Sequence, residues 1–175
     1  MGRKQDAPAA AAGVPVFNAK RVSKSGWCRL FRIYVSDGQV YFIRVGGHLA
    51  SEWEMQKPSL HTIRHAGLVG ILGEVLLRKI IRSRAQRRMA AADRDGPEMA
   101  LPRHRHSFKC RFSDFAGALF DTRILTSRVG GNGRWTFATQ DQGKQDFRLM
   151  TILDRKIAMD TLPKSLGDRL KVRAK

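Results

Sequence analysis

The sequence predicts an α+β fold, in which an antiparallel sheet carries a long inserted helix and ends in a C-terminal amphipathic helix. Three features carry this prediction. Strand-like runs pair over 29–47, a helical pattern covers 60–93, and alternating runs from 107 onwards lead into the amphipathic segment 151–162. We expect about six strands and two helices, with no internal repeat and no second domain.

The segment "RLFRIYVSDGQVYFIRVGG" at 29–47 is the strongest strand signal. Two runs rich in β-branched and aromatic residues flank Asp37-Gly38, which suits a two-residue type I′ turn because both of its central positions need positive φ. One face of the first run carries alternate apolar side chains, namely Phe31, Ile33 and Val35. The segment is therefore predicted to form a β-hairpin.

The region from Leu60 to about Asp93 repeats with the period of a helix. Its apolar side chains fall on one arc at 100° per residue, namely Leu68, Ile71, Leu72, Val75 and Leu76. Glycines recur at 67, 70 and 73 on the opposite side, although each costs about 1 kcal/mol of helix stability relative to alanine. We interpret these glycines as a sign of close packing and expect the helix to lie beneath the sheet.

The C-terminal half reads as a strand followed by a three-stranded meander. Phe108, Cys110 and Phe112 alternate with cations, as in a half-buried strand, and Ser113-Asp114 could cap a short helical turn through Leu119. The meander is predicted from "ILTSRV" at 124–129 and from two later runs with apolar alternation, containing Trp135 and Phe137 and then Phe147 and Leu149. Pro163 is expected to follow the terminal helix 151–162.

This pattern of elements resembles a pleckstrin-homology (PH) domain, in particular bacterial PH-like domains with a helical insertion between their sheets. The resemblance rests on the hairpin 29–46, "FKCRFSDF", the turn "GGNG" with "WTFAT", and the helix 151–162. It implies a PH-like sheet or barrel. Eukaryotic PH domains often bind phosphoinositides with cations around the first hairpin loop. Here that loop, 36–39, has no cation, so the site is not carried over.

The division of the chain follows from composition. Residues 1–26 are expected to be a flexible, basic, Ala/Pro-rich tail, 27–170 a single PH-like domain with the helical insertion at about 60–93, and 171–175 a basic tail. Cys28 and Cys110 are interpreted as reduced core residues rather than a disulfide framework. No signal peptide and no transmembrane stretch is recognisable, so we expect a cytoplasmic protein, with a peripheral membrane location open to it.

The charge balance is the most unusual property of the composition. The 175 residues include 33 Lys and Arg against 15 Asp and Glu, which gives a formal net charge of +18. Such a chain favours a polyanionic partner, either an anionic lipid surface or nucleic acid. The plainer alternative is a solvated basic surface.

No catalytic motif is present: the chain has no P-loop, GxSxG, HExxH or CxxC pattern. We therefore predict that it is not an enzyme and has neither a cofactor nor a small-molecule substrate. His61, His65, His104, His106 and Cys110 have side chains that can ligate Zn²⁺, but they lack a compact zinc signature. We interpret "RHRH" as part of the basic surface and expect no metal.

The segment "LRKIIRSRAQRR" at 77–88 holds six cations and no acid. Interaction with the helix dipole is worth about 0.3–1 kcal/mol per nearby charge, which accounts for one or two cations but not for six. The candidate anion-binding residues are therefore the cations of this segment and a second group that follows it: Arg78, Lys79, Arg82, Arg84, Arg87 and Arg88, then Arg103, Arg105, Lys109 and Arg111.

We expect a non-catalytic binding or scaffold module that docks on a polyanionic surface, with anionic membrane headgroups slightly favoured. A nucleic-acid-binding protein, RNA- or ribosome-associated, is the first alternative and a scaffold for a protein partner the second. Membrane binding predicts exposed apolar side chains beside the cations. RNA binding predicts cations that converge on one face, and a scaffold predicts an apolar groove with scattered charge.

Overall fold

The computed structural model describes residues 13–23, 28–47, 60–123 and 132–173, with backbone alone over 60–71 and at 74. Within these ranges the fold is α+β, as predicted. The elements in chain order are β1 (Val16–Val22), β2 (Cys28–Ser36), β3 (Gln39–Gly46), α2 (Leu60–Asp95), α3 (Pro97–Arg103), β4 (Phe108–Arg111), a 3₁₀ turn (Phe112–Asp114), β5 (Phe115–Asp121), β6 (Arg134–Thr139), β7 (Gly143–Leu149), α4 (Ile152–Leu166), a second 3₁₀ turn (Gly167–Arg169) and β8 (Leu170–Arg173).

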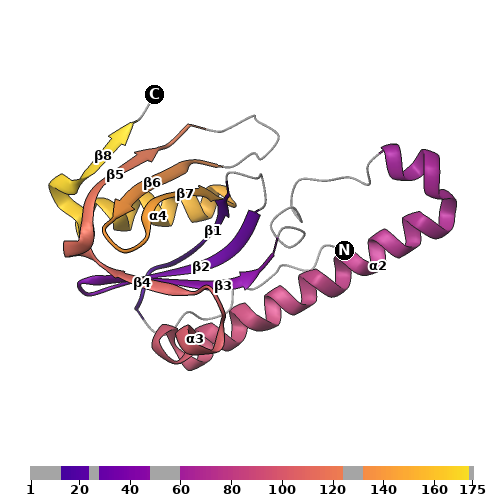
Figure 1. The fold of residues 1–175 in the computed structure, drawn as a ribbon, viewed down its shortest axis with the longest axis horizontal. Coiled ribbons are helices and arrows are strands. Elements are labelled where there is room, and N and C mark those ends of the chain that lie inside the picture. The colour runs from indigo at the N-terminus through magenta and orange to yellow at the C-terminus, as the bar shows by residue number, and fades with distance from the viewer. Residues whose placement is uncertain (1–12, 24–27, 48–59, 124–131, 174–175) are drawn as a thin grey trace.

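The described strands form one eight-stranded sheet in the order β4-β3-β2-β1-β7-β6-β5-β8 (Figure 1). Neighbouring strands are antiparallel, except that β5 and β8 run parallel. The sheet is open between β4 and β8, so the strands do not close into the expected barrel. Helices α2 and α3 lie between β3 and β4 in the chain, where the helical insertion was predicted.

Strand β1 joins the two meanders, β2–β4 and β5–β7, into one sheet. Ala19 lies opposite Phe31 of β2 on one side and opposite Leu149 of β7 on the other. The assignment of residues 1–26 to a flexible tail is therefore wrong for 16–22. The final tail is likewise wrong for 171–173, which belong to β8. Strand β8 pairs with β5, which lies far earlier in the chain, and β1 pairs with the distant β7 as well as with β2. Local composition does not reveal the distant partners.

The main core forms because the sheet curls until its two ends face each other. Phe42 on β3 stacks on Trp135 of β6 with ring centroids 5.7 Å apart, and on Phe147 of β7 at 5.1 Å. Strands β3 and β6 are not neighbours in the sheet, so these contacts bridge its two halves. The alternating faces predicted for the hairpin and for the later strands are confirmed, since Phe31 and Phe137 are buried in the same core.

Helix α4 completes this core. Ala158, Leu162 and Leu166 are buried against the sheet. Thr151 begins the helix through reciprocal bonds with Asp154: the Asp154 N–H donates to Thr151 Oγ1 at 2.9 Å, and the Thr151 N–H donates to the Asp154 carboxylate at 3.0 Å. Pro163 was expected to follow the helix, but the helix continues past it to Leu166, and the Gly167 N–H donates to the Pro163 carbonyl at its end.

Helix α2 packs differently from the prediction. Its C-terminal part buries Ala85, Met89 and Ala92 against the outer face of β2 and β3, where Tyr34 and Ile43 lie. Its N-terminal half projects beyond the sheet (Figure 1). A helix of 36 residues is about 54 Å long, whereas an eight-residue strand covers about 27 Å, so the sheet can support only part of it.

The expected burial of the apolar arc of α2 is wrong at the described positions. Leu72 is 65% exposed, Leu76 is 59% exposed, and Val75 is 51% exposed. A Cβ added at Gly73 would meet no atom within 4 Å, so this glycine does not mark close packing. The side chains of Leu68 and Ile71, and the surroundings of Gly67 and Gly70, lie outside the described residues.

Two further local predictions are corrected by the structure. The hairpin turn is not type I′, because only Gly38, with φ 76°, adopts positive φ and Asp37 avoids that strained region. The helical turn expected through Leu119 ends at Asp114, and 115–121 is strand β5, which supplies the first strand of the second meander. The strand predicted at 124–129 lies outside the described residues.

Candidate anion-binding site

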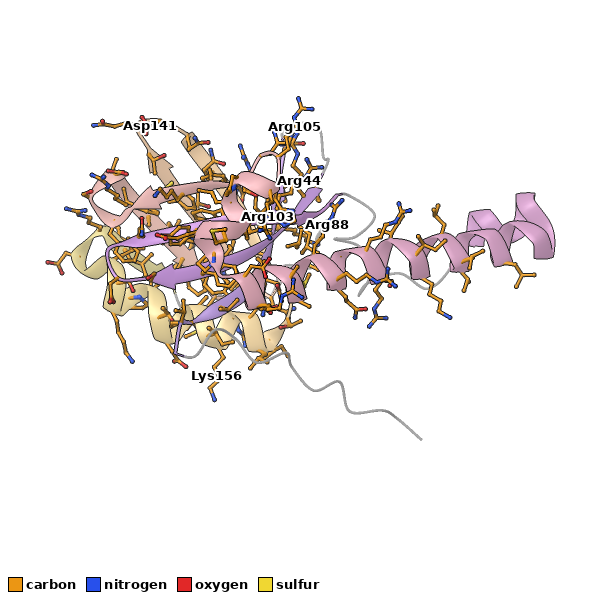
Figure 2. The ribbon with its side chains drawn as sticks, turned by 90° about the horizontal axis from the view of Figure 1, so that it is seen from below. Arg44, Arg88, Arg103, Arg105, Asp141 and Lys156 are labelled. Carbon is orange, nitrogen blue, oxygen red and sulfur yellow. The ribbon has the colours of Figure 1, made fainter. Side chains whose placement is uncertain are left out.

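A cleft of about 340 Å³ lies where α2 and α3 meet the end of β3. We call it the arginine cleft, and its lining residues are Arg44, Arg88, Arg103, His104 and Arg105. Arg44 comes from β3 and Arg88 from α2, while the other three follow one another at the end of α3. Figure 2 shows the four arginines together at the junction of the long helix and the sheet.

The chain reversal between α3 and β4 brings these residues together. Gly96, at φ 82°, separates α2 from α3, and Ala100 of α3 is buried with the outer face of β3. The Ser107 N–H then donates to the His104 carbonyl at 3.0 Å, and the Arg44 N–H donates to Ser107 Oγ at 2.9 Å. These bonds fasten the turn 104–107 to β3, which places Arg103 and Arg105 next to Arg44.

Burial and mutual repulsion act on the cations of the cleft. The pKa of Arg44 is lowered by burial first, then by the positive charges of Arg29, Arg88 and Arg105. The pKa of His104 is likewise lowered by burial, and then by Arg88 and Arg103. Since no carboxylate of the described residues lines the cleft, its like charges repel one another, and an anion that entered would relieve this repulsion.

One acidic side chain lies nearby, outside the lining. Asp95 accepts from Arg103 at 2.5 Å and from Arg94 at 2.9 Å. It compensates part of the charge of Arg103 and orients that guanidinium. The other described cations of the cleft gain no such counter-charge from Asp95.

The positive surface continues from the cleft over the ends of β1 and β2. Arg21 and Arg29 lie opposite each other in these strands, and the pKa of Arg21 is lowered by burial and by Arg29. His106 takes up positive φ and is exposed. Its pKa is lowered by burial first and then by neighbouring arginines, including Arg29 and Arg44.

A second feature adjoins the arginine cleft on the projecting half of α2. Exposed apolar side chains recur there at i, i+3, i+4 and i+8, and we call them the exposed stripe: Leu72, Val75, Leu76 and Ile80. Residues with this spacing are neighbours on one side of a helix. Arg82 lies at one edge of the stripe, Arg84 at the other and Lys79 within it, so apolar and cationic groups share one surface.

The predicted site residues thus separate into three groups. Arg88, Arg103 and Arg105 meet in the cleft. The other cations of the basic helix segment follow α2 away from it, namely Arg78, Lys79, Arg82, Arg84 and Arg87. Lys109 and Arg111 lie on β4 outside the cleft, with Lys109 Nζ 5.9 Å from the ring centroid of Tyr41.

Sequence reasoning missed Arg44 and His104. Arg44 occupies one alternate position of a strand, like many solvated cations, and only the turn 104–107 makes it part of a site. His104 was interpreted as general basic surface within "RHRH". The spacing of these two residues along the chain holds no signal for the cleft, because a 36-residue helix separates them.

Other chemistry finds no support among the described residues. They contain no group of three or more His, Cys, Asp and Glu side chains arranged to hold a metal ion. The side chains of His61 and His65 lie outside them. Neither cysteine forms a disulfide and both are buried, as expected, and burial raises the pKa of Cys110 to about 11.

Two findings complete the description of the site. No helix within the described ranges combines the length and the apolar character that crossing a membrane requires. No family model matches the chain, and neither a curated protein nor a solved structure is significantly similar to it.

Proposed function

We propose that this protein is a non-catalytic module that docks on anionic membrane surfaces through the projecting half of α2. The observation that carries the proposal is the exposed stripe, with cations at both of its edges. Helices that lie in the membrane interface combine an apolar face with flanking Lys and Arg. Five exposed aliphatic residues stand within nine positions of this helix: Leu72, Val75, Leu76, Leu77 and Ile80.

The energies of the two contributions are comparable. Burying an aliphatic side chain is worth about 1.5–3 kcal/mol when complete, and each Lys or Arg close to an anionic surface adds about 1 kcal/mol. The helix is held by the sheet at its C-terminal end, so docking does not have to meet the whole cost of forming it.

A PH-like architecture belongs to the same proposal. It is supported by the order of elements, since β1 and the meander β2–β4 precede the meander β5–β7 and α4. On this view α2 and α3 are an insertion between β3 and β4 that carries the membrane contact. The hairpin loop 36–39 takes no part, because it has no cation.

Nucleic acid is the competing partner, and two observations favour lipid over it. First, the phosphates of a nucleic acid offer no apolar surface, so contacts with them would leave the exposed stripe in water. In addition, single-stranded nucleic acids are bound largely by base stacking on aromatic side chains. Among the described residues, the exposed large hydrophobic side chains are all aliphatic or methionine.

The proposal is tested by sedimentation of the protein with vesicles of neutral phosphatidylcholine, with and without about 30% phosphatidylserine, across a salt series. We expect binding to the anionic vesicles alone and weaker binding at high salt. The double variant Leu76→Asp with Ile80→Asp should bind at least about tenfold more weakly, since the apolar contribution is lost.

The matched control is the double variant Ile152→Asp with Leu153→Asp, which places the same two charges on exposed apolar positions of α4. It should bind like the unmodified protein. Equal loss in both variants would refute the role of α2. Salt-dependent binding to single-stranded RNA without any binding to vesicles would refute membrane docking in favour of nucleic acid, and binding to neither would favour a protein partner.

A further inference from the structure

We infer that the arginine cleft is a specific pocket for one phosphate monoester group, distinct from the surface that α2 presents. The inference rests on the proposed membrane function insofar as a lipid headgroup is one carrier of such a group. A small soluble phosphate ester is the other carrier. The chemistry that the cleft recognises is the same in both: a compact dianion with oxygens pointing in several directions.

The number and type of donors fit such a dianion. A guanidinium presents its N–H groups in a planar fork that matches two oxygens of one phosphate. The cleft gathers four of these forks from separate parts of the fold: β3, α2, and the segment that ends α3. One of them, Arg103, also donates to Asp95 at 2.5 Å, which leaves its remaining N–H groups for the ligand.

The size of the cleft limits what it can hold. Its volume of about 340 Å³ is at the lower end of the range for small-molecule sites, about 300–1,000 Å³. That space suits a phosphate and the first atoms of its ester.

The backbone around the cleft is held in place. The Arg44 N–H donates to Ser107, and α2 is fixed to the sheet five residues beyond Arg88, where the buried carboxylate of Asp93 accepts two bonds from Arg32 at 3.0 and 2.9 Å. This backbone brings the cations close enough to repel one another, and lowered pKa values at Arg44 and His104 are consistent with this. A bound dianion would relieve the repulsion.

The cations of the projecting helix cannot do the same. At 1.5 Å per residue, Arg78 and Arg88 are about 15 Å apart along the axis of α2. A single phosphate can therefore contact only one or two of the helix cations, and their attraction for a membrane depends on total charge rather than on the headgroup. This difference makes the two surfaces separable by experiment.

The test uses the double variant Arg88→Gln with Arg105→Gln. Both side chains are exposed, so the fold should be retained, and circular dichroism checks this. The control pair is Arg84→Gln with Arg87→Gln, which removes the same charge from exposed positions of α2 outside the cleft. Binding of inorganic phosphate and of glycerol 3-phosphate is measured by isothermal titration calorimetry.

We expect saturable binding of both ligands with one site per chain. The cleft variant should bind at least about tenfold more weakly, since two charge-assisted contacts are lost, whereas the control pair should stay within about twofold. Equal weakening in both pairs, or the absence of saturable binding by the unmodified protein, would overturn the inference.

Vesicles of matched total charge identify the carrier. Preference for phosphatidate, whose headgroup is a phosphate monoester, over phosphatidylserine should disappear in the cleft variant if the carrier is lipid. Saturable binding of glycerol 3-phosphate without that preference assigns the cleft to a soluble ester. The variant Leu76→Asp with Ile80→Asp separates the two proposals, since it should lose vesicle binding and still bind inorganic phosphate.

Discussion

The buried carboxylate of Asp93 holds the base of α2 on the sheet, and its replacement by asparagine gives a quantitative test of this arrangement. Asp93 accepts from Arg32 Nε at 3.0 Å and from Arg32 Nη2 at 2.9 Å, and Tyr34 Oη donates to it at 2.6 Å. Arg32 also donates to Asn18 Oδ1 at 3.1 Å. The side chain of Asp93 is 3% exposed and that of Arg32 is 11% exposed.

Asp93→Asn keeps the shape of the side chain and removes its charge. Arg32 would then lose its directly paired carboxylate and keep only the more distant charge of Asp154, and breaking a buried pair from one side costs about 3–5 kcal/mol. Tyr34 would lose less, because the amide oxygen still accepts a hydrogen bond. Since burial and Asp93 raise the pKa of Tyr34, its phenol remains a donor at neutral pH. We expect the free energy of unfolding to fall by about 3–5 kcal/mol, a large part of the total of an ordinary domain.

Urea unfolding followed by tryptophan fluorescence measures this change, since Trp135 is completely buried in the main core. Asp141→Asn is the control, because Asp141 is an exposed carboxylate in the turn between β6 and β7 (Figure 2). The combined change Arg32→Met and Asp93→Leu with Tyr34→Phe, which removes the hydroxyl that donates to Asp93, should recover most of the loss, since a buried ion pair can be replaced by apolar side chains at little cost. A loss below about 1 kcal/mol in Asp93→Asn, or simple additivity in the combined variant, would refute the reasoning.

Three more outcomes follow from the structure. Cys28 and Cys110 are buried, and the pKa of Cys110 is raised to about 11. A thiol reagent at pH 8 should therefore label both only after unfolding, and rapid labelling of the folded protein would contradict this packing. The Arg123 guanidinium lowers the pKa of Asp121 to about 2 from an ordinary 3.8. The ionised Asp121 carboxylate therefore stabilises the fold above about pH 4, and this contribution is lost as the pH falls towards 2. Asp121→Asn should be about 1 kcal/mol less stable than the unmodified protein at pH 7 but no less stable at pH 2. Thermal unfolding at both pH values measures the difference. Leu162→Ala should cost about 2–5 kcal/mol, since Leu162 is completely buried, and a smaller loss in urea unfolding would show that the core collapses around the deleted atoms.

Regular elements with a clear local period were predictable. The hairpin 29–47 and the strand around Cys110 follow from alternation, which reports which side of a strand is buried, and the long helix follows from a period of 3.6 residues. The terminal helix was found for the same reason. Strand β1 was not predicted, because Val16–Val22 has mixed polarity and no clear alternation. It is a strand because it pairs with β2 on one side and with β7 on the other.

The apolar arc of α2 shows a limit of prediction from periodicity. Periodicity identified an apolar side of the helix but could not say what covers it. The length of the helix relative to the sheet decided that Leu72 and Leu76 are exposed, and this turned an expected core contact into a candidate membrane surface.

The sequence by itself determined that this chain is strongly basic, that its cations concentrate near 77–88, and that it folds as α+β. These properties depend on composition and on short-range periodicity, and both can be read from the sequence without knowledge of the fold. Only the tertiary structure decided that Arg88 meets Arg44 and Arg105 while Arg84 and Arg87 do not. The reason is physical, because a phosphate site requires several guanidiniums close together in space. The chain reversal at 104–107 and the packing of α2 on β3 bring them together, whereas their order in the sequence does not.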